Sequence, residues 1–486
     1  MAEQLSKRLC QDPTQLYEEQ AQVINPNEIR KAILHDLTEP LVFRGYLSTF
    51  KCEDEHVSQW KCMQWDASDW VKLFEEKVLK FRVGMRLKDK TVLSAPQWET
   101  ACYKANMTYS EFLQWSQGKR SCTTFCNQEV NCNDHWAYFD YFYMKDIENV
   151  NQVEGALDWG LFGFPDRGVQ DSTLWIGTTG ANTPCHIDTY GCNLVAQLIG
   201  RKRWVLFPRT QSEYLSPTRI PYEESSIYSE VGFPHPSVAS HPKLISSTPY
   251  VFTLEPGDVL FVPKQWWHFV ENLDFAVSIN TWLELPSDHE ERVKESLVMY
   301  QVASLCQGLE SLDLISSVFN PNMMDVATMT SSELLKLLTK RVFKNSVPRE
   351  TTAAKSNCEE VIREKPMRKQ SLITKDCNLL LDRKCTDFNW KDEKWCANHN
   401  IEKVCSMSFL DYMHLVFGPG SGNCCMETEV SMKKRDSLTK AQDANSRDDD
   451  DDDINFSQIK LLVDSFTDQR VISILKMVID EKLAEN

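Results

Sequence analysis

The feature that most constrains the fold of this chain is a pair of short segments that lie far apart and carry histidine and aspartate in strand-like surroundings. The first runs from Thr183 to Asp188, and the second runs from Pro256 to His268. In an extended strand alternate side chains share a face, so His186 and Asp188 point the same way. Two imidazoles and one carboxylate form the facial set of ligands that suits Fe(II) and leaves neighbouring coordination positions open. The sequence therefore predicts an iron site made of His186, Asp188 and His268.

The residues around these segments predict how the ligands are delivered. A turn signal precedes the apolar strand Val259 to Val262, and Pro263 ends that strand, so His268 is expected on the second strand of a hairpin. Between the two segments, two strand-like runs are broken at Gly200, and Lys202 follows the break. A cationic side chain is therefore expected at the end of a strand.

At these residues the sequence resembles the JmjC-domain Fe(II)/2-oxoglutarate-dependent oxygenases, in the small subgroup related to the asparaginyl and lysyl hydroxylases. The resemblance covers residues 39–285. It implies a catalytic Fe(II) held by His186, Asp188 and His268. It also implies a Lys202 ammonium paired with the distal carboxylate of the cosubstrate, and a Thr183 hydroxyl bonded to the same group. The full set of cosubstrate residues that it implies is Lys202, Thr183, Tyr138, Asn193 and Asn280.

One interval departs from the family pattern. The stretch from His186 to Asn193 is one residue longer than in the hydroxylase relatives, with Gly191 and Cys192 in the gap. A β-bulge is expected there, returning Asn193 to the pocket and leaving the ligands in place.

A narrower resemblance points to the branch of the family that associates with small heat-shock proteins. It rests on three stretches, residues 185–194, 200–204 and 218–226. It implies small heat-shock proteins as partners, a role in the cellular stress response and a cytoplasmic location. It does not imply a hydroxylation substrate.

The rest of the chain predicts a mainly β core with flanking helices. From His135 to Glu284, aromatic and β-branched runs split by glycine and proline predict a double-stranded β-helix, the cupin-like jelly roll of JmjC proteins. Helices are expected from residue 26 with Asn27 as cap, over 69–79, after a capping box at Thr108, from 288, over 332–342 and over 459–483.

These expectations divide the chain into six parts. Residues 1–25 are predicted to be a flexible arm, 26–135 the N-terminal part of the JmjC module, and 136–286 its β-helix core. Residues 287–343 are predicted to be a helical extension with a candidate homodimer face. A mostly disordered charged linker with six aspartates, Asp448 to Asp453, is expected over 344–455, and a C-terminal helix over 456–486.

Composition restricts the partners and the compartment. The formal charge of −17 opposes nonspecific attraction to nucleic-acid phosphates or anionic membranes. The seventeen cysteines are scattered and odd in number, which favours reduced thiols. No apolar run is long enough for a signal core or a membrane span, so a soluble intracellular protein is expected.

Three functions remain open from the sequence. The first is hydroxylation of a protein substrate, with demethylation as the outcome if the target carbon is an N-methyl group. The second is a noncatalytic scaffold that binds chaperones. The third is hydroxylation of an RNA base, resembling the JmjC enzyme of wybutosine maturation in transfer RNA, which would need a positive surface at the barrel mouth.

Overall fold

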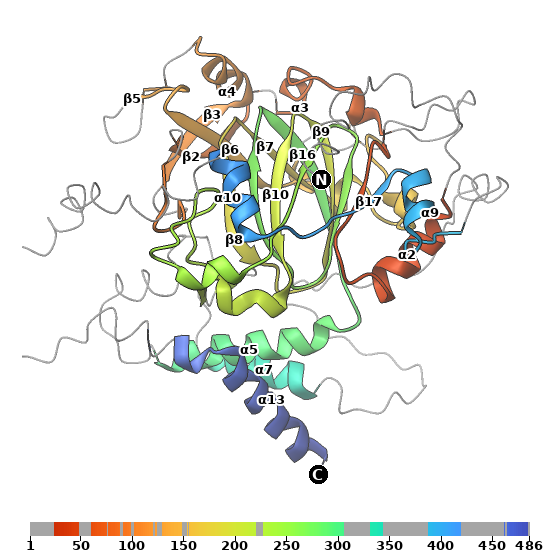
Figure 1. Cartoon of the computed structure of the whole chain (residues 1–486), viewed down its shortest axis with the longest axis vertical. Coiled ribbons are helices and arrows are strands. Elements are labelled where there is room, and N and C mark those ends of the chain that lie inside the picture. The colour runs from red at the N-terminus through yellow and green to blue at the C-terminus, as the bar shows by residue number, and fades with distance from the viewer. Residues whose placement is uncertain are drawn as a thin grey trace, which may run out of the picture.

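Two antiparallel sheets form the body of the protein in its structure, a computed structural model (Figure 1). It describes residues 24–47, 60–74, 76–87, 91–98, 102–119, 122–123, 129–147, 153, 155–219, 227–305, 331–343, 387–418, 461 and 464–484. The larger sheet contains β1 (Leu41–Phe43), β2 (Val78–Met85), β3 (Tyr103–Thr108), β6 (His135–Tyr143), β7 (Thr173–Gly177), β9 (Cys192–Ile199), β14 (Val259–Val262), β16 (Ala276–Leu283) and β17 (Ile401–Lys403). The smaller sheet contains β8 (Asn182–Ile187), β10 (Lys202–Phe207), β11 (Pro217–Arg219), β12 (Ile227–Ser229), β13 (Tyr250–Leu254) and β15 (Trp267–Asn272). β4 (Cys122–Thr123) and β5 (Glu129–Val130) pair separately.

The order of strands is β17-β1-β14-β9-β16-β7-β6-β2-β3 in the larger sheet and β11-β12-β8-β15-β10-β13 in the smaller one. Strands that follow one another in sequence, such as β8, β9 and β10, alternate between the two sheets. This alternation is that of a jelly roll and confirms the predicted fold class.

Side chains alternate between the inside of this barrel and two outer layers. Val195 and Leu260 of the larger sheet meet Trp204 and Leu206 of the smaller sheet in one buried cluster between the sheets. The opposite faces bury separate clusters, one outside each sheet. Both sheets are thus covered on two sides, which leaves the barrel interior as a sheltered place for polar side chains.

The connection that delivers His268 is not the predicted hairpin. β14 pairs with β1 and β9, whereas β15 pairs with β8 and β10. Residues 263–266 therefore form a corner from one sheet to the other, with Gln265 at a φ of 63°. The hairpin prediction was wrong because two neighbouring runs in a jelly roll belong to opposite sheets.

The predicted bulge at Gly191 and Cys192 is also wrong. Cys192 begins β9, and Gly191 lies in the turn between β8 and β9 with a φ of 66°. A side chain at Gly191 would collide with the carbonyl oxygen of Leu283. The extra residue is accommodated by this left-handed turn, which only glycine adopts readily.

The helices are α2 (Pro26–His35), α3 (Val71–Phe74), α4 (Tyr109–Ser116), α5 (Asp288–Leu305), α7 (Ser331–Phe343), α9 (Glu393–Asn398), α10 (Phe409–Phe417) and α13 (Gln469–Ala484). The capping box of α4 is confirmed, because Thr108 Oγ1 accepts from Glu111 N at 3.2 Å and Glu111 Oε2 accepts from Thr108 N at 2.9 Å. The cap of α2 is Asn25 rather than Asn27, since Asn27 N donates to Asn25 Oδ1.

The helix predicted over 69–79 is wrong beyond Phe74. α3 ends there, and β2 begins at Val78. Leu79, Phe81 and Val83 are buried at every second position, and β2 pairs with β3 and β6. The alternation of buried residues in this segment is typical of a strand, whereas the spacing before it is typical of a helix. A strand forms here because its alternate residues are buried in the sheet.

The predicted helical C-terminal extension is confirmed. α5, α7 and α13 lie together below the sheets in Figure 1 and bury a cluster of Val293, Leu297, Val298, Val302, Leu338 and Ile472. Arg219 Nη1 lies 2.8 Å from Glu295 Oε2 and joins β11 to α5. None of the described helices combines the length and apolar character that a membrane-spanning helix needs.

Residues 387–418, here called the C-terminal strap, differ from the expected linker. β17 pairs with β1 at the edge of the larger sheet, and Ser406 bridges to Tyr250 at the edge of the smaller one. α10 then packs Phe409, Tyr412, Met413 and Phe417 onto the outer face of the smaller sheet. The charge of the surrounding sequence obscured this apolar helical stripe. Residues 1–23 of the arm predicted over 1–25 lie outside the described residues, as do the six aspartates. Ile24 and Asn25 do not belong to a flexible arm, because Ile24 is buried in the core and Asn25 caps α2.

Candidate metal centre

His186, Asp188 and His268 come together inside the barrel. His186 and His268 are directly opposite residues of β8 and β15, with ring centroids 4.2 Å apart. Asp188 follows β8, with one carboxylate oxygen 3.4 Å from His186 Nε2 and the other 4.0 Å from His268 Nε2. The ligand atoms of the three residues lie within 4.8 Å of one another. This is the arrangement that a single metal ion needs.

Both histidine rings are oriented by a hydrogen bond to the backbone carbonyl of the residue two positions earlier. Nδ1 of His186 lies 2.8 Å from the carbonyl oxygen of Pro184, and Nδ1 of His268 lies 3.0 Å from that of Trp266. A carbonyl only accepts, so each Nδ1 carries the proton and each Nε2 keeps its lone pair for the pocket. Hydrogen bonds of this kind fix the tautomer of metal-bound histidines.

Burial and mutual charge set the protonation of this cluster. Burial and, to a smaller extent, the neighbouring His186 lower the pKa of His268 to about 4. Burial alone would raise the pKa of Asp188, but its contacts with His186 and His268 and the hydrogen bond from Trp282 hold it well below its usual value. Neutral imidazoles beside an ionised carboxylate are the protonation states that bind a divalent cation.

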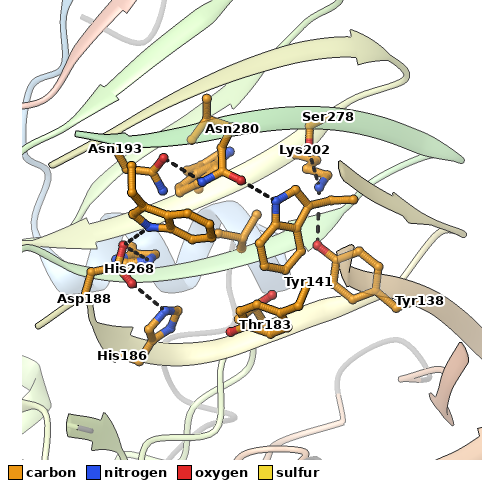
Figure 2. A pocket seen from close by; sticks show the side chains of 15 residues that line it. Tyr138, Tyr141, Thr183, His186, Asp188, Asn193, Lys202, His268, Ser278 and Asn280 are labelled. Carbon is orange, nitrogen blue, oxygen red and sulfur yellow. Dashed lines mark hydrogen bonds and ion pairs between the residues drawn. The ribbon is translucent and has the colours of Figure 1, made fainter. Parts of the chain in front are cut away.

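Trp282 supports the carboxylate from the opposite sheet. Its Nε1 donates to Asp188 Oδ2 at 3.1 Å, as Figure 2 shows. Trp282 lies on β16 directly opposite Asn193 of β9. The larger sheet therefore orients a ligand that follows a strand of the smaller sheet.

Lys202 lies at the other end of the pocket. Its ammonium is 2.6 Å from Ser278 Oγ and 3.4 Å from Tyr138 Oη, and only 2% of the residue is exposed (Figure 2). Burial lowers the pKa of Lys202 to about 7, although the charge of Asp140 acts in the opposite direction. No ion pair joins Lys202 to an acidic residue in the part of the chain that the structure describes. A buried ammonium without a counter-ion suits a ligand that brings its own carboxylate.

Thr183 lines the same pocket because β8 is irregular. Pairing of β8 with β15 shifts between His268 and Val270, so that Pro184 and Cys185 lie opposite the single residue Phe269. This bulge places Thr183 and His186 on one face although they are three residues apart. Cys185 and Ile187 pack on the opposite face, as alternation predicts.

Tyr138, Asn193 and Asn280 also reach the pocket, as the resemblance predicts, and Figure 2 shows the two asparagines in contact. Asn280 Nδ2 donates to Asn193 Oδ1 at 2.9 Å, and Trp175 Nε1 donates to Asn280 Oδ1 at 2.7 Å. The whole set of cosubstrate residues predicted from the sequence therefore lines one cavity. Their individual roles stay predictions.

The cavity also contains residues that the sequence analysis did not assign. They are Tyr141, Trp175, Val195, Trp204, Val270, Ser278 and Trp282. Ser278 and Trp282 flank Asn280 at every second position of β16, which was a readable signal. Tyr141 gave no such signal, because its place in the pocket depends on a bulge in β6. Trp175 of β7 lies directly opposite Ser278, a pairing that the sequence alone does not reveal. The space between these walls, open mouth included, is about 460 Å³.

The chain matches a known family over this region. The cupin-like domain family matches residues 26–289, more than half of the 486 residues. HSPB1-associated protein 1 of Bos taurus is 40% identical over 292 residues, which is 59% of this chain and 57% of the relative. Lysine-specific demethylase JMJ31 of Arabidopsis thaliana is 28% identical over 145 residues, covering 29% of this chain and 26% of the relative. tRNA wybutosine-synthesizing protein 5 of Homo sapiens is 32% identical over 149 residues, covering 30% and 45% respectively.

Proposed function

The chain belongs to the cupin-like domain family, and on that basis we propose that it is an Fe(II)- and 2-oxoglutarate-dependent oxygenase that hydroxylates a protein side chain. The observation that carries the proposal is the convergence of His186, Asp188 and His268 at one end of a cavity whose other end holds the buried Lys202. Three inward-facing ligands suit the metal, and a buried ammonium suits the cosubstrate.

The residues of the pocket fit these two groups. His186 Nε2, His268 Nε2 and one Asp188 oxygen would hold Fe(II), which supplies the O2-dependent oxidation of a C–H bond as 2-oxoglutarate is converted to succinate. Lys202 would pair with the distal carboxylate, beside Ser278 and Tyr138. Trp282 would hold the Asp188 carboxylate in place, and the aromatic walls would limit the access of water.

Association with small heat-shock proteins is the second part of the proposal. The name of the cattle relative states an association with HSPB1, and the match spans little more than half the length of that relative. The same relationship leads us to propose a role in the stress response and a cytoplasmic location. A noncatalytic chaperone-binding scaffold is the alternative.

An RNA substrate is favoured by one observation, the similarity to tRNA wybutosine-synthesizing protein 5. The formal charge of −17 opposes it, because RNA binding depends on attraction between basic side chains and phosphates. A protein substrate therefore remains the proposal.

The test is succinate release from 2-oxoglutarate after oxygen is admitted to protein loaded anaerobically with Fe(II). Wild type should release succinate, and His186→Ala and Lys202→Ala should not. Lys80→Ala, a change at an exposed lysine of β2, controls for removal of a lysine. Release that persists in His186→Ala would refute the proposed metal site, and metal binding without cosubstrate binding in wild type would favour the scaffold.

A further inference from the structure

Three side chains from three adjacent strands of the larger sheet form a directed chain of hydrogen bonds. Trp175 of β7 donates to Asn280 of β16 at 2.7 Å, and Asn280 donates to Asn193 of β9 at 2.9 Å (Figure 2). Asn280 is 1% exposed and Asn193 is 7% exposed. The chain crosses the wall of the pocket between the metal ligands and Lys202.

The indole at the start of this chain determines its direction. A tryptophan Nε1–H donates and never accepts, so Asn280 must turn its oxygen toward Trp175. Asn280 Nδ2 then faces Asn193, so Asn193 must accept the hydrogen bond through its Oδ1. Both amides are therefore fixed in one orientation, although an isolated asparagine can present either atom.

The last group of the chain is an N–H donor. Asn193 Nδ2 makes no hydrogen bond to any other residue among those described, and Asn193 lines the cavity. It lies beside Trp282, its cross-strand partner, whose Nε1 bonds Asp188. The donor is thus at the metal end of the pocket, opposite to the Lys202 end.

Trp175 is itself held by an irregular neighbour. Pairing of β6 with β7 shifts between Phe139 and Phe142, so that Asp140 and Tyr141 lie opposite the single residue Trp175. Tyr141 adopts a φ of 54°, a strained conformation for a residue with a bulky side chain, and its ring lies 4.5 Å from that of Trp175. The bulge turns Tyr141 into the pocket, where it packs on the indole.

We propose that Trp175 is a positioning residue that acts through Asn280 to make Asn193 a hydrogen-bond donor for an oxygen of the bound 2-oxo acid. The inference rests on the proposed function, because it assumes that a 2-oxo acid occupies the pocket. It assigns the metal end of the cavity a preference for ligands that present an unprotonated carboxylate or keto oxygen.

The test is a double-mutant cycle on 2-oxoglutarate binding, measured by calorimetry with protein loaded with Ni(II), which supports no turnover. The four proteins are wild type, Trp175→Phe, Asn193→Leu and the double variant. Trp175→Phe should weaken binding about threefold to tenfold, the value of one hydrogen bond, and should add little in the Asn193→Leu background.

Trp204→Phe, alone and with Asn193→Leu, is the matched control. Trp204 lines the same pocket, but its buried Nε1 has no hydrogen-bond partner in the described structure. This variant therefore reports the cost of replacing indole by phenyl in the pocket wall. If Trp175→Phe does not bind Ni(II), Asn280→Leu replaces it in the same cycle, since it breaks the chain at its middle member.

Additive losses for Trp175→Phe and Asn193→Leu would overturn the inference, because they would assign Trp175 a packing role independent of Asn193. An effect of Trp175→Phe equal to that of Trp204→Phe would also overturn it. Failure of the wild type to bind 2-oxoglutarate is a different outcome, which would refute the proposed function.

Discussion

At the scale of single residues, the pocket holds an acidic side chain with basic neighbours, Asp188, and a basic side chain with no ion pair among the described residues, Lys202. Asp188 has two histidines and an indole around it, whereas Lys202 has the hydroxyl groups of Ser278 and Tyr138. Hydroxyl groups solvate an ammonium less well than a carboxylate does. Burial among hydroxyl groups therefore favours the neutral amine more than water does, and a bound carboxylate should favour the ammonium.

This reversal predicts proton uptake on cosubstrate binding. Burial lowers the pKa of Lys202 to about 7, so below that pH the side chain is already charged and binding takes up no proton. Above pH 7 binding must return a proton to Nζ, and affinity should fall by up to about tenfold per pH unit. Calorimetry at pH 8 in two buffers of different ionisation enthalpy measures the uptake, and Lys202→Met should abolish it. Identical heats for the wild type in both buffers would contradict the account.

The indole of Trp282 should contribute to metal affinity without touching the metal. Trp282→Phe removes the donor to Asp188 Oδ2 and keeps an aromatic ring in place. Loss of such outer hydrogen bonds costs about 10–100-fold in metal affinity. Titration with Mn(II) measures the change, and Trp204→Phe is again the matched ring substitution. Equal affinities of Trp282→Phe and the wild type would show that the hydrogen bond has no such role.

The positions of individual site residues were predictable only where strands are regular. His186, Asp188 and the inward residues of β16 follow simple alternation. Thr183 and Tyr141 reach the pocket because bulges in β8 and β6 shift them by one position. A bulge depends on how a strand pairs with its neighbour, so residue spacing within one strand does not reveal it.

At the scale of elements, the C-terminal strap closes one side of the barrel. Arg44 beside β1 binds both Asp258 and Glu402, at 2.6 Å each, and so joins the barrel to β17. α10 covers the outer face of β8 and β15, where it meets Cys185, Ile187, Trp267 and Phe269. These residues flank His186 and His268 in sequence. The strap therefore supports the two strands that carry the ligands.

Removal of the central side chain of α10 should destabilise the fold. Tyr412 is fully buried, and its hydroxyl donates to the carbonyl oxygen of Pro234 at 2.6 Å. Tyr412→Ala should lower the free energy of unfolding by about 3–5 kcal/mol, as for other large aromatic side chains in cores. Urea denaturation measures the loss.

The control for this variant lies on the same helix. Leu415 is 54% exposed, so Leu415→Ala should change stability by no more than about 0.5 kcal/mol. If Tyr412→Ala proved as stable as Leu415→Ala, the strap would not be part of the cooperative core.

Long regular elements were predictable from the sequence, whereas short segments with competing patterns were not. The sheet region and helices α5 and α7 were predictable from sustained periodicity, and so was a C-terminal helix, although α13 begins at Gln469 and not at residue 459. The strap was not, because its nine-residue helix and three-residue strand lie in charged surroundings and gain their stability from contacts with distant strands. The hairpin before His268 failed for a related reason, since sheet membership is decided by the whole topology.

At the scale of the whole molecule, the two histidines of the candidate metal centre are enclosed, while the helical extension is peripheral. His186 and His268 are 4% and 5% exposed, and α5, α7 and α13 form their own cluster below the sheets. A folded partner protein that binds the outside of the molecule need not contact the metal ligands. Catalysis and partner binding should therefore be separable.

This separation predicts that His186→Ala abolishes succinate release but leaves the affinity for a small heat-shock protein unchanged within about twofold. Calorimetry with purified small heat-shock protein measures the second property. Loss of both succinate release and chaperone affinity, in a variant with unchanged thermal stability, would show that the partner contacts the metal site itself.

The proposed function depends on iron held by His186, Asp188 and His268 together. Anomalous diffraction at the iron edge, from crystals grown anaerobically with Fe(II), tests it most directly. We expect a peak bounded by the two Nε2 atoms and the Asp188 carboxylate in wild type, and none there in His186→Ala. The absence of a peak at this place in wild-type crystals saturated with Fe(II) would contradict it.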